Sequence, residues 1–210
     1  MQLRALFGGT FDPIHRGHIE TALALLDELA ITTLHVMPNA IPPHKPQPLA
    51  TGEQRLKMVE LACRPYHALI AEDFELTAPQ PSYTVKTLQR FKQLHPADTL
   101  LFVMGMDSLV SLDSWYQWQT LTQLAHLIVM PRPGCELAQA SKPLQHFIQQ
   151  HQCASASQLK QFSQGGIYLA KTPLVNVSAT AIREQLHQHH SSDALPLAVA
   201  DYIQQQQLYR

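Results

Sequence analysis

The chain has 210 residues, of which 45% are hydrophobic and 15% are charged, so it is long and apolar enough to bury the core of one large domain. Its formal net charge of −1 at pH 7 argues against a nucleic-acid binder that works through a broad basic face. No apolar run approaches the roughly 18 residues that cross a bilayer, the start of the chain lacks a basic region with a cleavage site, and the three cysteines lie far apart; we therefore expect a cytoplasmic protein with free thiols and no membrane partner.

Apolar runs and amphipathic segments alternate along the chain. A strand-like opening, "QLRALFGG", is followed by helical spacing of apolar residues from His18 to Ala30. Further strands are expected at 32–38, 67–72, 99–105, 126–131 and 166–170, and further helices at 51–63, 82–94, 115–125, 178–189 and 196–208. Thr51 is a plausible N-cap with Gln54 completing a capping box, and Ser82 is a second plausible N-cap.

Strands separated by helix-sized segments predict a doubly wound α/β fold with a mainly parallel sheet, whose ligands bind beyond the carboxyl ends of the strands. We expect a single domain over residues 1–210. Within it, residues 134–165 are more polar than the rest and are expected to lie outside the sheet, and residues 178–208 are expected to form a C-terminal helical segment.

The stretch "GGTFDPIHRGH", residues 8–18, joins the first strand to the first helix. Gly8 and Gly9 allow a sharp turn, and the free N–H groups of the helix N-terminus favour a bound phosphate. His15 and His18 would add imidazole donors aimed at the same anion. Two other interpretations stay open, a pair of metal ligands and a pair of ordinary structural histidines, although no acidic or cysteine partner stands at zinc-like spacing.

These residues resemble the signature of the nucleotidylyltransferase superfamily, with its HxGH element at His15, Gly17 and His18. A second stretch, "VSATAIR" at 177–183, resembles the ISSTxIR motif of the same superfamily, with Ser178, Thr180 and Arg183 matching. Ala179 replaces the second serine, which puts one phosphate hydrogen bond in doubt. The resemblance implies a Rossmann-like nucleotidyltransferase fold and transfer of a nucleoside monophosphate from a nucleoside triphosphate to a phosphate acceptor.

Further stretches resemble the bacterial nicotinate-nucleotide adenylyltransferases over nearly the whole chain: "PNAIPPHK", "SYTVKTL", "GMDSL", "WYQW" and "RPG". The resemblance implies ATP and nicotinate mononucleotide as substrates and deamido-NAD and pyrophosphate as products, with Mg²⁺ carried by ATP and held mainly by phosphate and water. The residues expected to bind ATP are Gly8, Gly9, Thr10, Phe11, His15, His18, Gly105, Asp107, Arg132, Ser178, Thr180 and Arg183. Those expected to bind nicotinate mononucleotide are Asn39, His44, Lys45, Tyr83, Thr84, Trp115 and Tyr116.

The catalytic work is assigned to His18, His15 and Arg183, and no residue is assigned as a metal ligand. Plainer roles stay open for several residues: a solvated linker for Lys45, helix capping for Thr84 and Asp107, and a surface position for Arg132. Three alternatives for the function also remain, namely nicotinamide mononucleotide or phosphopantetheine as the acceptor, and a nucleotide-binding module without turnover. The sequence leaves monomer and homo-oligomer undecided.

Overall fold

The computed structural model describes residues 2–40, 47–79, 82–189 and 191–210. Within that part of the chain, a 6-stranded sheet has the order β3-β2-β1-β4-β5-β6, and every neighbouring pair is parallel. The strands are β1 (Leu3–Gly9), β2 (Leu34–Pro38), β3 (Leu69–Ala71), β4 (Thr99–Gly105), β5 (His126–Met130) and β6 (Ile167–Leu169). The chain winds outward from β1 in one direction and then from β4 in the other, so the topological switch point lies between β1 and β4. The prediction of a doubly wound α/β fold is confirmed.

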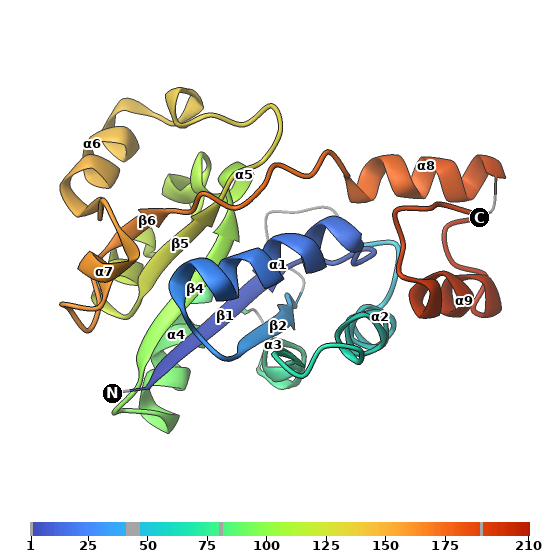
Figure 1. Cartoon of the computed structure of the whole chain (residues 1–210), viewed down its shortest axis with the longest axis horizontal. Coiled ribbons are helices and arrows are strands. Elements are labelled where there is room, and N and C mark those ends of the chain that lie inside the picture. Colours follow the sequence, from blue (N-terminus) through green and yellow to red (C-terminus); the bar gives the residue numbers. More distant parts are fainter. Residues whose placement is uncertain (1, 41–46, 80–81, 190) are drawn as a thin grey trace.

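The helices connect these strands and cover both faces of the sheet (Figure 1). The α-helices are α1 (Arg16–Leu29), α2 (Gly52–Cys63), α3 (Phe74–Thr77), α4 (Thr84–Leu94), α5 (Met106–Leu109), α6 (Lys142–His151), α7 (Ala156–Leu159), α8 (Ala179–His189) and α9 (Leu197–Gln205). Short 3-10 turns are η1 (Leu112–Ser114), η2 (Trp118–Gln123) and η3 (Leu137–Gln139). None of the helices in the described part of the chain is long and apolar enough to cross a membrane.

The core consists of two apolar clusters, one on each face of the sheet. Alternate residues of β1 point to opposite faces, because side chains alternate along a strand. Ala5 and Phe7 join the cluster that includes buried residues of α1, α2, α8 and α9, whereas Leu6 joins the cluster that includes buried residues of α4 and α6. Strand β4 is buried along nearly its whole length, as its continuous apolar sequence predicts.

The predicted capping box of α2 is confirmed, and the predicted cap of α4 is wrong. Thr51 Oγ1 accepts from the Gln54 N–H at 3.2 Å, and Gln54 Oε1 accepts from the Thr51 N–H at 2.9 Å. Helix α4 instead begins after Tyr83, which makes no side-chain cap. The Ser82 hydroxyl bonds to the carboxylate of Glu75, whose pKa is raised by burial. Burying a carboxylate without hydrogen-bond donors is costly, so the Ser82 hydroxyl bonds to Glu75 and not to the N-terminus of α4.

In two other segments the structure differs from the elements that were expected from the sequence. Within the expected helix at 115–125, the structure has the 3-10 turn η2, preceded by Gln117 in a left-handed conformation at φ 52°. The polar stretch 134–165 contains η3, α6 and α7, and α6 contributes the fully buried Leu144 and Ile148 to the core. The division into a single domain over residues 1–210, with a polar excursion at 134–165 and a C-terminal helical segment at 178–208, stays a prediction.

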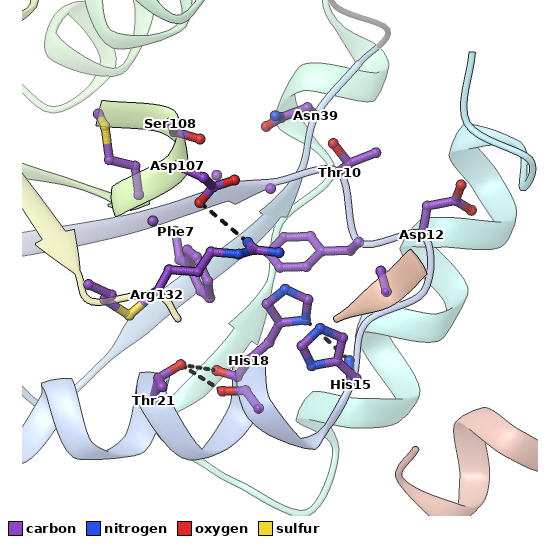
Figure 2. A pocket seen from close by; sticks show the side chains of 18 of the residues that line it. Phe7, Thr10, Asp12, His15, His18, Thr21, Asn39, Asp107, Ser108 and Arg132 are labelled. Atoms are coloured by element: carbon purple, nitrogen blue, oxygen red, sulfur yellow. Dashed lines mark hydrogen bonds and ion pairs between the residues drawn. The ribbon is translucent and has the colours of Figure 1, made fainter. Parts of the chain in front are cut away.

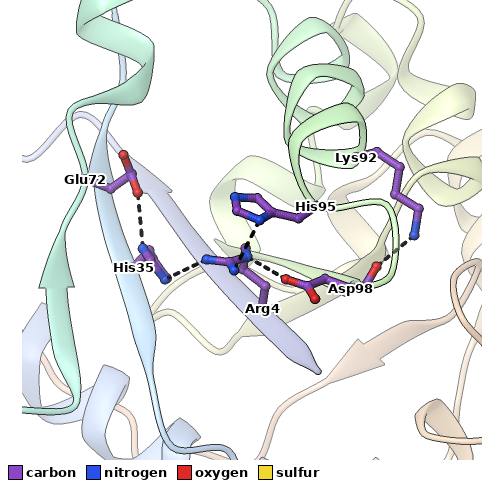
Figure 3. Close-up of polar contacts among 6 residues, drawn as sticks. All are labelled: Arg4, His35, Glu72, Lys92, His95 and Asp98. Atoms are coloured by element: carbon purple, nitrogen blue, oxygen red, sulfur yellow. Dashed lines mark hydrogen bonds and ion pairs between the residues drawn. The ribbon is translucent and has the colours of Figure 1, made fainter. Parts of the chain in front are cut away.

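A polar network lies at the amino end of β1, far along the strand from its carboxyl end (Figure 3). Arg4 donates through Nε to Asp98 Oδ2 at 2.9 Å, and its Nη atoms face His35 Nε2 and His95 Nδ1, both at 3.4 Å. Because a guanidinium only donates, both of these ring nitrogens accept, and the proton of His35 lies on Nδ1, which donates to Glu72 at 3.1 Å. The network ties β1 to β2, to the turn after β3 and to the turn before β4.

The difference between core and surface positions on α4 gives a stability test. Leu88 is fully buried and Leu94 is 57% exposed on the same helix. We expect Leu88→Ala to lower the free energy of unfolding by about 2–5 kcal/mol, because it removes buried apolar surface and leaves a cavity. Leu94→Ala should change it by no more than about 0.5 kcal/mol. Urea unfolding monitored by circular dichroism measures both, and equal losses would contradict the assigned orientation of α4.

Candidate active site

A cavity of about 550 Å³ opens at the carboxyl ends of β1, β4 and β5. Its walls come from the β1–α1 loop, the ends of β2, β4 and β5, residues 47–49 and the start of α8. This is the edge of the sheet at which doubly wound folds bind their ligands, next to the switch point. The residues labelled in Figure 2 come from β1, the β1–α1 loop, α1 and the segments that follow β2, β4 and β5.

The β1–α1 loop approaches its own aromatic ring so closely that one position requires glycine. A Cβ at Gly9 would lie 2.6 Å from the Phe11 ring. Phe11 itself has φ 48°, in the left-handed region, and its ring packs edge-on against Phe7 at 5.3 Å and His18 at 5.1 Å. The loop therefore has one conformation imposed by packing, and Gly8, Gly9, Thr10 and Phe11 all line the cavity.

His15 and His18 lie at the N-terminus of α1 with their rings stacked, 3.6 Å apart between centroids. His18 Nδ1 accepts from the His15 backbone N–H at 3.2 Å, so in the neutral ring the proton is on Nε2, which is free to donate. His15 is only 3% exposed, and neither of its ring nitrogens has a hydrogen-bond partner. A buried polar side chain without a partner indicates a missing one, and this side chain lines the cavity.

The electrostatic surroundings keep both imidazoles neutral in the free protein. Burial, and then the charge of Arg132, lower the pKa of His15 to about 4. Burial also lowers the pKa of His18, with smaller contributions from His15 and Arg132. At pH 7 the pair therefore presents uncharged N–H donors, and an anion bound beside them would raise both pKa values.

Two of the predicted ATP-binding residues are bound to each other. Arg132 Nη1 donates to Asp107 Oδ1 at 3.3 Å, with both side chains about 40% exposed (Figure 2). Asp107 lies over Gly105, where a Cβ would be 2.5 Å from its carboxylate oxygen, so the glycine allows this fold-back. All three residues line the cavity.

The second motif is only partly at the cavity. Arg183 lines it and is held by two bonds, from Nη1 to the Asp12 carbonyl at 2.7 Å and from Nη2 to Thr180 Oγ1 at 3.2 Å. Ser178 Oγ accepts from the Ala181 N–H at 3.2 Å and so caps α8. Ser178 and Thr180 are not among the lining residues, whereas Ala179, at the place of the missing serine, is.

The residues predicted for nicotinate mononucleotide fall into three groups. Asn39 and Trp115 line the cavity. Tyr83, Thr84 and Tyr116 do not, although the Tyr83 and Tyr116 rings lie together at 4.7 Å. His44 and Lys45 lie outside the described residues.

Several lining residues were missed by reasoning from the sequence. Thr21 lies one turn along α1 from the histidines, and its position follows from helical spacing. Ser108 stands next to Asp107 in a stretch already singled out. Val177 opens the second motif, and Phe102 and Met130 lie in strands that were predicted as strands only. Gln47, Pro48, Leu49 and Val175 belong to segments with no recognisable local signal.

The described residues contain no group of three or more His, Cys, Asp or Glu side chains that could hold a metal ion. Cys63, Cys135 and Cys153 are free thiols.

Comparisons with known proteins agree with this geometry. The cytidylyltransferase-like family matches residues 6–185. A probable nicotinate-nucleotide adenylyltransferase from Idiomarina loihiensis is 52% identical over 207 residues and covers 99% of both chains. One from Serratia proteamaculans is 45% identical over 210 residues, covering 99% of this chain and 96% of its own.

Solved structures show the same fold. The nicotinic acid mononucleotide adenylyltransferase of Plasmodium falciparum, complexed with NaAD, has a TM-score of 0.71 at 18% identity and covers 100% of this chain and 98% of its own. Because both cavity-lining motifs and these full-length relatives agree, the chain belongs to the cytidylyltransferase-like family and, within it, to the bacterial nicotinate-nucleotide adenylyltransferases.

Proposed function

We propose that the protein transfers the adenylyl group of ATP to nicotinate mononucleotide, forming deamido-NAD and pyrophosphate, and so acts in NAD biosynthesis. The observation that carries the proposal is the buried, unpartnered His15 beside the free Nε2 of His18 at the N-terminus of α1. Both lie in a cavity that also contains the cations Arg132 and Arg183. Such a cavity is suited to a polyphosphate, and the full-length relatives support nicotinate mononucleotide as the acceptor.

The reaction is a direct in-line displacement. An oxygen of the acceptor phosphate forms a bond to the α-phosphorus of ATP, the bond from that phosphorus to the bridging oxygen breaks, and pyrophosphate leaves with the electron pair. The acceptor oxygen is already ionised, so the protein supplies no general base. Its residues align the two nucleotides and stabilise charge on the phosphoryl oxygens.

We assign the donor role at the α-phosphate to His18, through Nε2–H. His15 and Arg183 would bind the β- and γ-phosphates, and Arg132 would leave Asp107 to join them. Asp107 would then accept from ribose hydroxyls. Ser178 and Thr180 stay predicted phosphate ligands, and their present bonds would have to change for them to reach the nucleotide.

Gly8, Gly9, Thr10, Phe11 and Gly105 would form the wall against which ATP lies. The acceptor would lie nearer Asn39 and Trp115, whose indole offers a flat surface to the pyridine ring. Tyr83, Thr84 and Tyr116 would reach it only by a movement toward the cavity, and His44 and Lys45 remain predictions.

Enzymes of this class generally use a divalent metal with ATP. We propose Mg²⁺, which neutralises charge on the phosphates and is held by them and by water. The free thiols of the described residues support a cytoplasmic location, where cysteines stay reduced.

The assignment is tested by measuring pyrophosphate release from MgATP in parallel with nicotinate mononucleotide, nicotinamide mononucleotide and phosphopantetheine. We expect strong release with the nicotinate compound. Release only with another acceptor would keep the chemistry and overturn the acceptor, and ATP binding without release under any acceptor would indicate a binding module.

His18→Ala should lower kcat by roughly 100- to 1,000-fold with the fold intact, because it removes a preorganised donor from the transition state. His18→Gln, whose amide can still donate, should lose less. His67→Ala, at an exposed histidine on the surface, is the control and should leave turnover unchanged. A folded His18→Ala enzyme with near-normal turnover would remove His18 from the mechanism.

MgATP binding should take up protons at pH values between the pKa values of the imidazoles in the free protein and in the complex. The imidazoles are neutral in the free protein, with the pKa of His15 at about 4, and the bound triphosphate raises both pKa values. Affinity should therefore rise as the pH falls through the pKa values of the complex. Calorimetry in buffers of different ionisation enthalpy measures the uptake, with a His15→Asn/His18→Asn double variant as the control. Equal proton uptake in both proteins would show that the imidazoles stay neutral.

A further inference from the structure

The C-terminal end of the chain lies against the β1–α1 loop. The Tyr209 hydroxyl donates to Asp12 Oδ1 at 2.6 Å across 197 residues of sequence, and both side chains are buried. Tyr209 has φ 62°, a left-handed conformation that a bulky residue adopts only where its surroundings hold it. Figure 1 shows the C-terminus beside α8 and α9, on the side of the molecule where α1 begins.

Asp12 joins three separate segments through one carboxylate. Besides the Tyr209 hydroxyl, it accepts from the Leu49 N–H at 2.9 Å and from the Ala50 N–H at 3.1 Å. Burial, and then the hydrogen bond to Asp12, raise the pKa of Tyr209, so its hydroxyl keeps its proton and remains a donor. The loop, the segment before α2 and the C-terminal tail therefore meet at one buried carboxylate.

Asp12 is linked to the wall of the cavity through two of its groups, the backbone carbonyl and the carboxylate. Its backbone carbonyl accepts from Arg183 Nη1 at 2.7 Å, which fixes the guanidinium at the cavity wall. Its carboxylate holds the end of the segment whose residues Gln47, Pro48 and Leu49 line the cavity. A shift of Asp12 would displace both Arg183 and this wall.

We propose that Tyr209 is a positioning residue for adenylyl transfer, whose hydroxyl fixes Asp12 and, through it, Arg183 and the cavity wall at residues 47–49. Tyr209 does not line the cavity, so it acts through Asp12 rather than on the substrates. The proposal rests on the proposed function for its kinetic part. Its structural part, that the tail holds the loop, stands on the contacts alone.

The chain offers a matched control for the loss of the hydroxyl. Tyr168 on β6 also donates to a carboxylate at 2.6 Å, that of Glu28 on α1. Glu28, like Asp12, accepts backbone N–H bonds as well, from Lys171 at 2.9 and 3.0 Å. None of these three residues lines the cavity. Tyr209→Phe and Tyr168→Phe therefore remove the same kind of bond at different places.

We expect Tyr209→Phe to lower kcat/KM for MgATP by about tenfold, the size of a lost hydrogen bond to a charged group, chiefly through KM. Tyr168→Phe should leave kcat/KM within about twofold of the unmodified enzyme, because its bond supports no cavity residue. Hydrogen exchange adds a readout at the bonds themselves. The amides of Leu49 and Ala50 should exchange faster in Tyr209→Phe and at the unmodified rate in Tyr168→Phe. Equal kinetics in the two variants, or unchanged exchange at these amides, would overturn the proposal.

If Tyr209→Phe does not fold, amide hydrogen exchange in the unmodified protein tests the proposal. The Leu208 N–H is bound to the Ile203 carbonyl at 3.0 Å and reports on opening of the tail. Over a series of low denaturant concentrations, the amides of Leu208, Leu49 and Ala50 should open together, and independent opening would reject the role of Tyr209. Pyrophosphate release by the unmodified enzyme is measured before any variant is compared. If the unmodified enzyme releases none, the proposed function is rejected instead of the role of Tyr209.

Discussion

The buried carboxylate of Asp12 is the interaction on which the arrangement of the cavity depends. A charge that is only 6% exposed has to be satisfied by donors, because its desolvation is otherwise costly. The donors come from Leu49, Ala50 and Tyr209, each on a segment that local structure alone would leave apart. Satisfying this one charge brings the β1–α1 loop, the segment before α2 and the C-terminal tail together under the nucleotide cavity.

Other polar groups at the cavity, by contrast, have no permanent partner or only a weak one. The ring nitrogens of His15 are buried and unpartnered, and Arg132 and Asp107 are bound only to each other. A half-exposed ion pair of this kind contributes about 0–1 kcal/mol, so a nucleotide can break it at little cost. The hydrogen-bonded junction at Asp12 therefore supports a surface whose hydrogen-bonding groups are available to a ligand.

The positive charge that would attract a triphosphate is local to the cavity. The chain as a whole carries a formal charge of −1, yet Arg132 and Arg183 border the cavity and the N-terminus of α1 points into it. Arg132 also helps to keep the histidines neutral, since its charge lowers the pKa of both. An anion that offsets this charge changes the protonation of the site as it binds.

Most of the fold and the centre of the site could be predicted from the sequence, because they depend on short-range pattern. Short apolar runs predicted the strands, period-3.6 spacing predicted the main helices, and the motif spacing put His15 and His18 on one helix end. The errors have a tertiary origin. Ser82 bonds to the buried Glu75 rather than capping α4, and the segment expected to be helical at 115–125 contains a 3-10 turn.

The sequence by itself determined the doubly wound order of elements and the family, since the apolar and helical patterns and the two motifs are each encoded within a few neighbouring residues. Only the tertiary structure decided that Arg132 pairs with Asp107, that Ala179 rather than Ser178 faces the cavity, and that Tyr209 holds Asp12. Contacts between residues 197 positions apart depend on how helices pack against both faces of the sheet, and no local pattern specifies that packing.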